Sequence, residues 1–136
     1  MLKKLGSKLK EQKGFTLIEL LAVIVILGII AAIAIPAITS VIGKSDNKAK
    51  VQEGIQIINA AKLYVADTRP AAGDIDKVQL VEYLDKVQDD TYEVAIGLTA
   101  SGKYTYTLKT HEAVALADQD DPSDGATEQE LLEYTK

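Results

Sequence analysis

His111 is the only histidine in the chain, and the chain contains no cysteine. Composition alone therefore excludes disulfides, thiolate catalysis and cysteine metal centres. His111 follows a predicted strand, and we expect it on a loop where an imidazole is more commonly solvated than catalytic. The sequence offers no Ser/His/Asp arrangement, no glycine-rich phosphate loop and no metal-spaced histidines. These observations predict a protein that is not an enzyme.

Four aspartates crowd the stretch before Gly125, namely Asp118, Asp120, Asp121 and Asp124. Carboxylates at this density can bind Ca²⁺. Their spacing differs from that of an EF-hand, and Pro122 interrupts it. The alternative is a solvated acidic loop. We therefore expect no obligatory cofactor and keep Ca²⁺ at this loop as a secondary candidate.

Two lysines and two tyrosines gather near a predicted turn, namely Lys103, Tyr104, Tyr106 and Lys109. Such a basic and aromatic patch can contact DNA, although tyrosines that alternate along a strand also serve the packing of a sheet. The whole chain carries −5 and residues 1–14 carry +4, so residues 15–136 carry −9. An acidic surface repels phosphates, which argues against a dedicated nucleic-acid binder and leaves DNA contact as a minor candidate.

A long apolar segment dominates the first third of the chain. Residues 20–35 contain no charged or polar side chain, and the apolar character continues to Ile42. As a helix, residues 20–42 span roughly 34 Å, and a bilayer core is about 30 Å thick. Five lysines precede this segment within residues 1–14, and they favour an N-terminus on the cytoplasmic side. The pattern predicts a single membrane crossing.

Three interpretations of this N-terminal region compete. A secretory signal peptide would have a basic start and a small-residue site such as Ala32-Ile33-Ala34, but its apolar part is usually only about 7–15 residues long. A plain membrane anchor explains the length and the lysines, but it gives no role to the residues just before the apolar run. The third interpretation is a signal that is cut before that run, so that the apolar segment would stay with the mature protein.

Glu19 is the only charged residue between Phe15 and Gly43. An isolated carboxylate in apolar surroundings either becomes protonated or finds a partner. Phe15 and Glu19 are four residues apart and share a helix face, so a pair within one subunit or between neighbours is sterically available. The alternative is that Glu19 lies at the headgroup level or interacts with the helix dipole.

Gly28 and Pro36 weaken the same predicted helix. Gly28 lowers helix propensity by about 1 kcal/mol relative to Ala. Pro36 removes a backbone donor and crowds the preceding turn. The residues between them are rich in β-branched Ile. We expect the helix to kink or melt here, and Gly28 can alternatively allow close helix packing.

The run Gly14-Phe15-Thr16-Leu17-Ile18-Glu19 resembles the cleavage and methylation motif of the type IV pilin family, and the resemblance extends through Gly28 and Pro36. It implies that a prepilin peptidase cuts between Gly14 and Phe15 and that Phe15 is then N-methylated. It also implies that Glu19 neutralises the amine of a neighbouring subunit during assembly. The stretch from Gly28 to Pro36 would lose helicity in the filament.

The resemblance further implies a homopolymer that moves from the cytoplasmic membrane into an extracellular or cell-envelope filament. Its partners would be the prepilin peptidase and an inner-membrane assembly machine. A surface pilus or fimbrium, a competence pseudopilus for DNA uptake and a type II secretion pseudopilus all share the motif. The chain has no Trp, which disfavours the main secretion pseudopilin because that protein is expected to contain Pro-Trp-Gly. The rival from another class is a membrane-anchored binding module that does not polymerise.

Downstream residues predict a small globular domain. A helical seam of Val51, Ile55, Ile58, Lys62 and Val65 runs toward a break at Arg69–Asp74. Period-two alternation predicts a hairpin of strands 92–98 and 104–108 around a turn at 100–103. We also expect a short helix over Asp76–Val87 capped by Asp74 or Asp76, a third strand at Ala113–Ala117, and a terminal helix that starts at a capping box in Thr127–Glu130.

These elements predict the α+β class with a pilin fold, in which a long N-terminal helix with a membrane-spanning first half packs on a small antiparallel sheet. The predicted boundaries are 1–14 for a cleaved basic leader, 15–42 for the apolar transmembrane and filament-core helix, and 43–136 for an extracytoplasmic globular domain.

Overall fold

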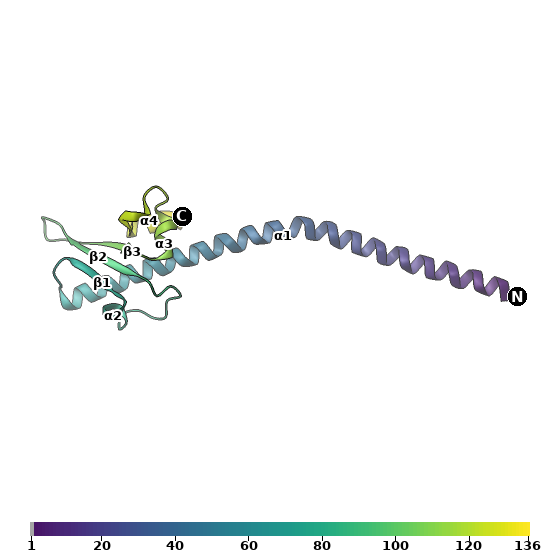
Figure 1. Cartoon of the computed structure of the whole chain (residues 1–136), viewed down its shortest axis with the longest axis horizontal. Helices are drawn as coiled ribbons and strands as arrows, with labels where there is room; N and C mark the ends of the chain where they lie inside the picture. The colour runs from purple at the N-terminus through teal and green to yellow at the C-terminus, as the bar shows by residue number, and fades with distance from the viewer. Residues whose placement is uncertain (1) are drawn as a thin grey trace. The chain divides into compact units, whose positions relative to one another are not determined.

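The computed structural model describes the backbone of residues 2–136 and the side chains of residues 14–136. The leader predicted for residues 1–14 therefore lies almost entirely outside the described side chains. The elements in chain order are α1 (Leu2–Thr68), β1 (Gly73–Asp76), α2 (Lys77–Leu80), β2 (Glu93–Leu98), β3 (Tyr104–Lys109), α3 (Glu112–Ala117), η1 (Pro122–Asp124), β4 (Ala126–Thr127) and α4 (Glu128–Tyr134) (Figure 1). The chain divides into two compact units, Met1–Gly43 and Lys44–Lys136.

The second unit is built on an antiparallel sheet in the order β1-β2-β3-β4. The predicted β2–β3 hairpin is confirmed, with Glu93 paired to Lys109 at its open end and Leu98 paired to Tyr104 at its closed end. The two outer strands were not predicted. β1 has four residues and β4 has two, so neither is long enough to produce a clear alternation in the sequence.

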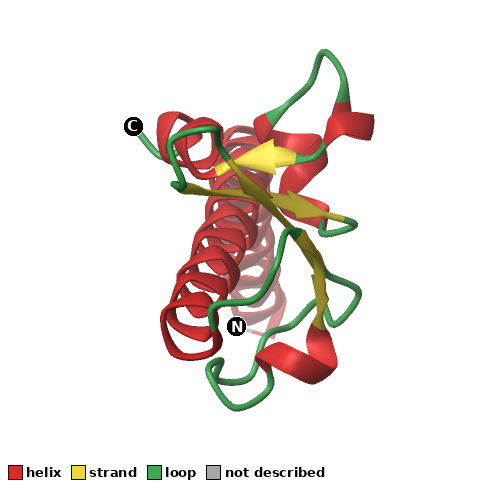
Figure 2. Cartoon of the chain, turned by 90° about the vertical axis from the view of Figure 1, so that its left-hand side faces the viewer, coloured by secondary structure: helices red, strands yellow, loops and turns green. Residues whose placement is uncertain are grey.

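The last part of α1 covers one face of this sheet, as Figure 2 shows. Of the predicted seam, Val51, Ile58 and Val65 are buried, whereas Lys62 is half-buried and forms an ion pair with Glu128 at 2.5 Å. The core joins α1 to all four strands and α4 through Val51, Ile57, Ile58, Ala61, Val65, Ile75, Val94, Ile96, Leu108, Ala126 and Leu131. The predicted α+β class, with a long helix packed on an antiparallel sheet, is confirmed.

At Gly54, α1 packs closely against the rest of this unit. A Cβ atom at this position would lie 2.9 Å from Leu108 Cδ2 and 3.0 Å from Ala113 Cβ. Glycine is therefore needed here for packing, because a methyl group would force its neighbours to move.

The strand predicted at Ala113–Ala117 is wrong, because these residues belong to α3. An uninterrupted apolar run of this length does not distinguish a strand from a short helix. His111 decides the outcome, since its side chain accepts a hydrogen bond from the backbone N–H of Ala113 and so caps the helix. The buried residues Ala113 and Val114 then fix the face that α3 turns toward the core.

The helix predicted at Asp76–Val87 is much shorter than expected and ends at Leu80. Asp76 caps it as predicted, in a capping box with Gln79. Leu84 and Val87 still pack against the core, but they do so from a loop. The terminal helix is confirmed, with the predicted capping box between Thr127 and Glu130 at its start.

Candidate assembly site

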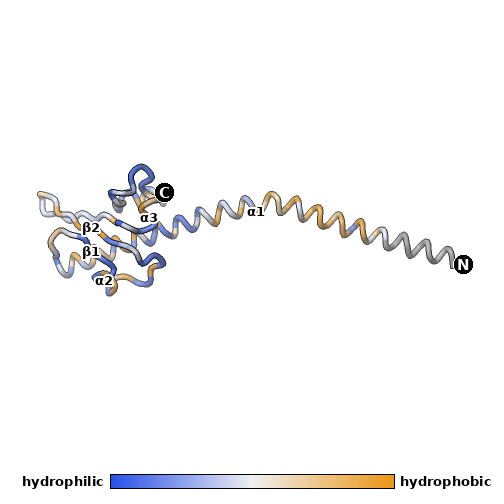
Figure 3. Tube along the Cα trace, in the orientation of Figure 1, coloured by the Kyte–Doolittle hydropathy of each residue, from blue (hydrophilic) through white to orange (hydrophobic). Residues whose placement is uncertain are grey.

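The apolar part of α1 is a stretch of hydrophobic residues, coloured orange along the Cα trace in Figure 3. Every large apolar side chain from Phe15 to Ile42 is at least 50% exposed. The most hydrophobic stretch of the helix contains no buried residue. By length and composition this helix can cross a membrane. A patch of this size is far beyond what a free soluble subunit usually exposes, so lipid or other chains must cover it.

Glu19 is exposed on this apolar surface, one helical turn after Phe15. Among the described residues, no hydrogen bond or ion pair reaches its carboxylate. In the intact chain the nitrogen of Phe15 is an uncharged amide, so it offers no positive partner. A cut between Gly14 and Phe15 would create an ammonium group on the same helix face as Glu19.

Pro36 lies inside α1, and the helix continues through both Gly28 and Pro36. Proline has no N–H, so the carbonyl of Ala32 loses its usual donor one turn further on. In the following turn, the Thr39 hydroxyl donates a hydrogen bond to the carbonyl of Ile35 at 2.9 Å. The backbone ladder therefore lacks one hydrogen bond at this point, and kinking or melting here stays a prediction.

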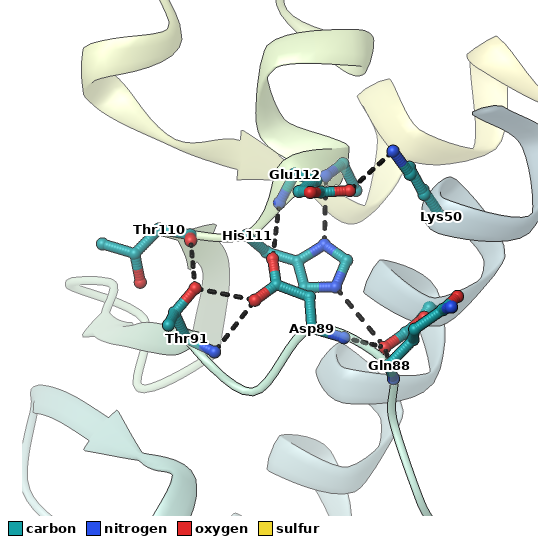
Figure 4. A network of polar contacts seen from close by, with 9 residues as sticks. Lys50, Gln88, Asp89, Thr91, Thr110, His111 and Glu112 are labelled. Carbon is teal, nitrogen blue, oxygen red and sulfur yellow. Dashed lines mark hydrogen bonds and ion pairs between the residues drawn. The ribbon is translucent and has the colours of Figure 1, made fainter. Parts of the chain in front are cut away.

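The expectation for His111 is wrong, because its imidazole is buried rather than solvated. Nδ1 accepts a hydrogen bond from the Ala113 N–H at 3.0 Å, as Figure 4 shows. Nε2 lies 3.8 Å from Glu53 Oε1, which is too long for a hydrogen bond, and it has no other partner. No sequence signal could have placed His111 beside Glu53, since the two are 58 positions apart.

Asp89 and Glu53 hold the loop at 88–91 through hydrogen bonds. Figure 4 shows Gln88, Asp89 and Thr91 of this loop near His111. Glu53 Oε1 accepts hydrogen bonds from the backbone N–H groups of Gln88 and Asp89. Asp89 in turn accepts bonds from the Thr91 backbone and hydroxyl and from the Glu112 N–H. Burial raises the pKa of Asp89, but these hydrogen bonds outweigh burial and hold the pKa below its usual value.

The acidic loop organises itself through local hydrogen bonds. Asp118 accepts from the N–H groups of Asp120 and Asp121, and Asp121 accepts from the backbone and hydroxyl of Ser123. The bonds from Ser123 lower the pKa of the Asp121 carboxyl. Among the residues that the structure describes, no three acidic or histidine side chains converge in a way that could hold a metal ion.

The basic and aromatic residues considered for DNA are mostly engaged within the domain. Lys109 pairs with Asp74 at 3.3 Å, and the Tyr104 hydroxyl donates to the Pro70 carbonyl at 2.9 Å. Tyr106 is half-buried beneath Lys62, whose ammonium lies 6.0 Å from the ring centre. Lys103 is exposed at the hairpin tip. These contacts favour sheet packing over a surface for DNA.

An exposed apolar helix with one carboxylate near its Gly–Phe bond, packed further along on an antiparallel sheet, defines an α+β protein of pilin-like architecture. Residues 9–35 match the family model described as the prokaryotic N-terminal methylation motif. Together with the relatives described next, this match supports assignment of the chain to the type IV pilin family, as the Gly14–Glu19 run predicted.

The chain is 37% identical to the type IV major fimbrial protein FimA of Dichelobacter nodosus strain VCS1703A over 53% of this chain and 48% of that protein. It is 35% identical to a fimbrial protein of Dichelobacter nodosus over 67% of this chain and 60% of that protein. It is 44% identical to fimbrial protein Q of Moraxella bovis over 69% of this chain and 52% of that protein. The chain thus spans about half the length of the curated relatives it matches. No solved structure matches it significantly.

Proposed function

We propose that this chain is a pilin, a structural subunit that polymerises into a type IV pilus. The observation that carries the proposal is the exposed apolar surface from Phe15 to Ile42, which begins within the match to the methylation motif at residues 9–35. Such a surface must be shielded from water both in the membrane and in the filament. Lipid covers it before assembly, and the apolar helices of other subunits cover it in a filament.

In this proposal, a prepilin peptidase cuts the chain between Gly14 and Phe15 and Phe15 is N-methylated. The cut removes all five lysines of residues 1–14 and keeps the apolar helix in the mature protein. Before the cut, those lysines hold the N-terminus on the cytoplasmic side of the inner membrane. An inner-membrane assembly machine then moves the subunit into the filament.

Glu19 serves assembly by pairing with the new amine of Phe15 on a neighbouring subunit. Its carboxylate is exposed and without a partner among the described residues, so it is free to meet a charge that another chain supplies. Transfer of an unpaired carboxylate into an apolar core is costly, and the pair removes that cost. The pair therefore favours a neighbouring subunit whose helix is positioned so that its Phe15 amine meets Glu19, over one whose helix is shifted along the axis.

The similar proteins are named as fimbrial proteins, which favours a surface pilus over a competence or secretion pseudopilus. The function is structural rather than enzymatic, in keeping with the pilin family.

Two measurements on cells that express the chain with a matching assembly system test the proposal. Mass spectrometry of the mature protein should show a chain that starts at Phe15 with one added methyl group. Electron microscopy of sheared material should show filaments made of this chain. A mature chain that starts at Met1 or after Ala34 would refute the processing step. A correctly processed chain that never leaves the membrane would instead identify a membrane-anchored module.

A further inference from the structure

A titratable side chain forms the cap of α3. His111 is the only histidine of the chain, and its ring is buried directly before Glu112, the first residue of this helix. Its Nδ1 accepts a hydrogen bond from the Ala113 N–H at 3.0 Å. An imidazole is the side chain that changes its charge between about pH 5 and 8. The cap of α3 therefore depends on the charge of one ring.

The capping hydrogen bond determines which ring nitrogen receives a second proton. Because Nδ1 is the acceptor, the neutral ring carries its proton on Nε2. A second proton must then go to Nδ1, toward which the Ala113 N–H already points. Both nitrogens are donors in the charged ring, and two donors cannot form a hydrogen bond with each other. Protonation of His111 and capping of α3 therefore exclude one another.

The start of α3 is also an unfavourable place for a positive ring. The N–H groups of the first turn of a helix carry partial positive charges, so an anion at this end stabilises the helix and a cation destabilises it. The neutral imidazole avoids this repulsion. A charged imidazole at the same position loses the hydrogen bond to Ala113 and gains a repulsive interaction with the helix.

The other ring nitrogen faces carboxylates. Nε2 lies 3.8 Å from Glu53 Oε1 and has no hydrogen-bond partner among the residues that the structure describes. The backbone N–H of Asp89 donates to Glu53, and the Asp89 carboxylate accepts from the Glu112 N–H (Figure 4). A positive ring is attracted to both carboxylates, because opposite charges interact more strongly where water is excluded. Protonation therefore moves the favourable partners of the ring from the helix to the carboxylates.

The other charged groups around the ring are engaged in ion pairs. Those that line the cavity beside it are Asp46, Lys50, Asp90 and Glu112. They pair with one another or with Lys77. Burial raises the pKa of Asp89, but the hydrogen bonds to its carboxylate outweigh burial and hold the pKa below its usual value. Asp89 is therefore a negative partner throughout the pH range in which an imidazole titrates.

We propose that protonation of His111 releases the start of α3 and draws the ring toward Glu53 and Asp89, so that the globular unit contains a pH-sensitive switch. The neutral ring caps the helix, and the charged ring pairs with the carboxylates. Release frees the first turn of α3, where Ala113 packs closely against α1 at Gly54. The switch lies within the globular unit and does not depend on polymerisation.

The single histidine makes the switch directly observable by NMR of the full chain in detergent, since nitrogen-15 labelling of histidine gives ring signals from His111 alone. At about pH 8 we expect a proton on Nε2 and none on Nδ1, and toward about pH 5 both nitrogens should be protonated. Over the same range, the hydrogen-exchange protection of the Ala113 amide, corrected for its intrinsic rate, should fall by about 2- to 30-fold, as expected for loss of a helix cap. The amide of Ile58, which is buried in α1, should keep its protection.

His111→Asn is the matched control, because its amide retains an acceptor for the cap but does not titrate. In this variant the protection of Ala113 should stay constant between about pH 8 and 5. A proton on Nδ1 at the higher pH, or a ring that stays neutral until the domain unfolds, would overturn the switch. An Ala113 amide that stays protected beside a doubly protonated ring would do so as well. So would an equal loss of protection at Ile58 or in His111→Asn, because the loss would then not come from release of α3 by the ring.

Discussion

The imidazole of His111 caps helix α3 by accepting a hydrogen bond from the Ala113 N–H at 3.0 Å. Ser, Thr, Asp or Asn usually fills this role, and loss of such a cap costs about 0.5–2 kcal/mol. Here the capping side chain is also buried, so its ring contributes to packing. The histidine that looked like a solvated loop residue is a structural part of the domain.

His111→Ala should therefore lower the free energy of unfolding by about 2 kcal/mol or more, through loss of the cap and of buried volume. His111→Asn keeps an acceptor in a similar place and should cost clearly less. Urea unfolding of the full chain in detergent, followed by the fluorescence of its six tyrosines, measures both. Equal losses for the two variants would contradict the capping role.

The lowered pKa of Asp89 predicts that the stability of the fold depends on pH. Its pKa is lowered in the folded state, so its contribution to stability is present above the unfolded pKa of about 3.9 and is lost as the pH falls through the folded value. Asp89→Asn removes the ionisation. We expect the wild type to be the more stable at pH 7 and the difference to shrink progressively below about pH 4. A difference that stays constant over this range would show that the ionisation of Asp89 is not involved.

Leu131 and Leu132 are adjacent on α4 and form a matched pair. Leu131 is fully buried, whereas Leu132 is 44% exposed. Leu131→Ala should destabilise the domain by about 2–5 kcal/mol, because it leaves a cavity against β3 and α1. Leu132→Ala should change stability by about 0.5 kcal/mol or less. Similar losses in the two variants would mean that α4 is not seated on the core as described.

Glu19→Ala tests the assembly pair. Removal of one partner from a buried ion pair costs about 3–5 kcal/mol, so filament yield should fall by about 100-fold or more. Cleavage before Phe15 should continue, as mass spectrometry of the membrane fraction can verify. Glu19→Asp, which retains the charge, serves as the control and should recover part of the yield. Normal filaments from Glu19→Ala would rule out the pairing.

Pro36→Ala and Gly28→Ala should both strengthen α1, to different extents. The expected gains in helix stability are about 3 kcal/mol for Pro36→Ala and about 1 kcal/mol for Gly28→Ala. Hydrogen exchange of residues 29–35 in detergent measures them, and protection should increase more for the proline variant. If exchange stays unchanged in both variants, these two residues do not set the weak point of the helix.

Features encoded by local pattern were predictable from the sequence. The alternation around Tyr104 and Tyr106 and the capping box at Thr127 both identified their elements correctly. The apolar run after Glu19 and the family motif before it were likewise readable without coordinates, because both are contiguous in the chain.

Features that depend on distant residues were not predictable. The identity of α3 rests on the cap from His111, and the burial of His111 rests on Glu53 in α1 and on the loop around Asp89. The periodicity of hydrophobic residues along the sequence carries no information about such contacts. The short strands β1 and β4 were missed for a related reason, since they exist through pairing with β2 and β3 rather than through their own sequence.

The short outer strands β1 and β4 also affect whether the sheets of neighbouring domains can pair with one another. β4 has two residues and runs directly into α4, while β1 places Asp74 and Asp76 on its outer margin and runs directly into α2. Brief, charged margins offer little backbone for a foreign strand to pair with. In the proposed filament, many of these domains would lie next to one another at a very high local concentration. We expect these short outer strands to limit strand pairing between the sheets of neighbouring domains.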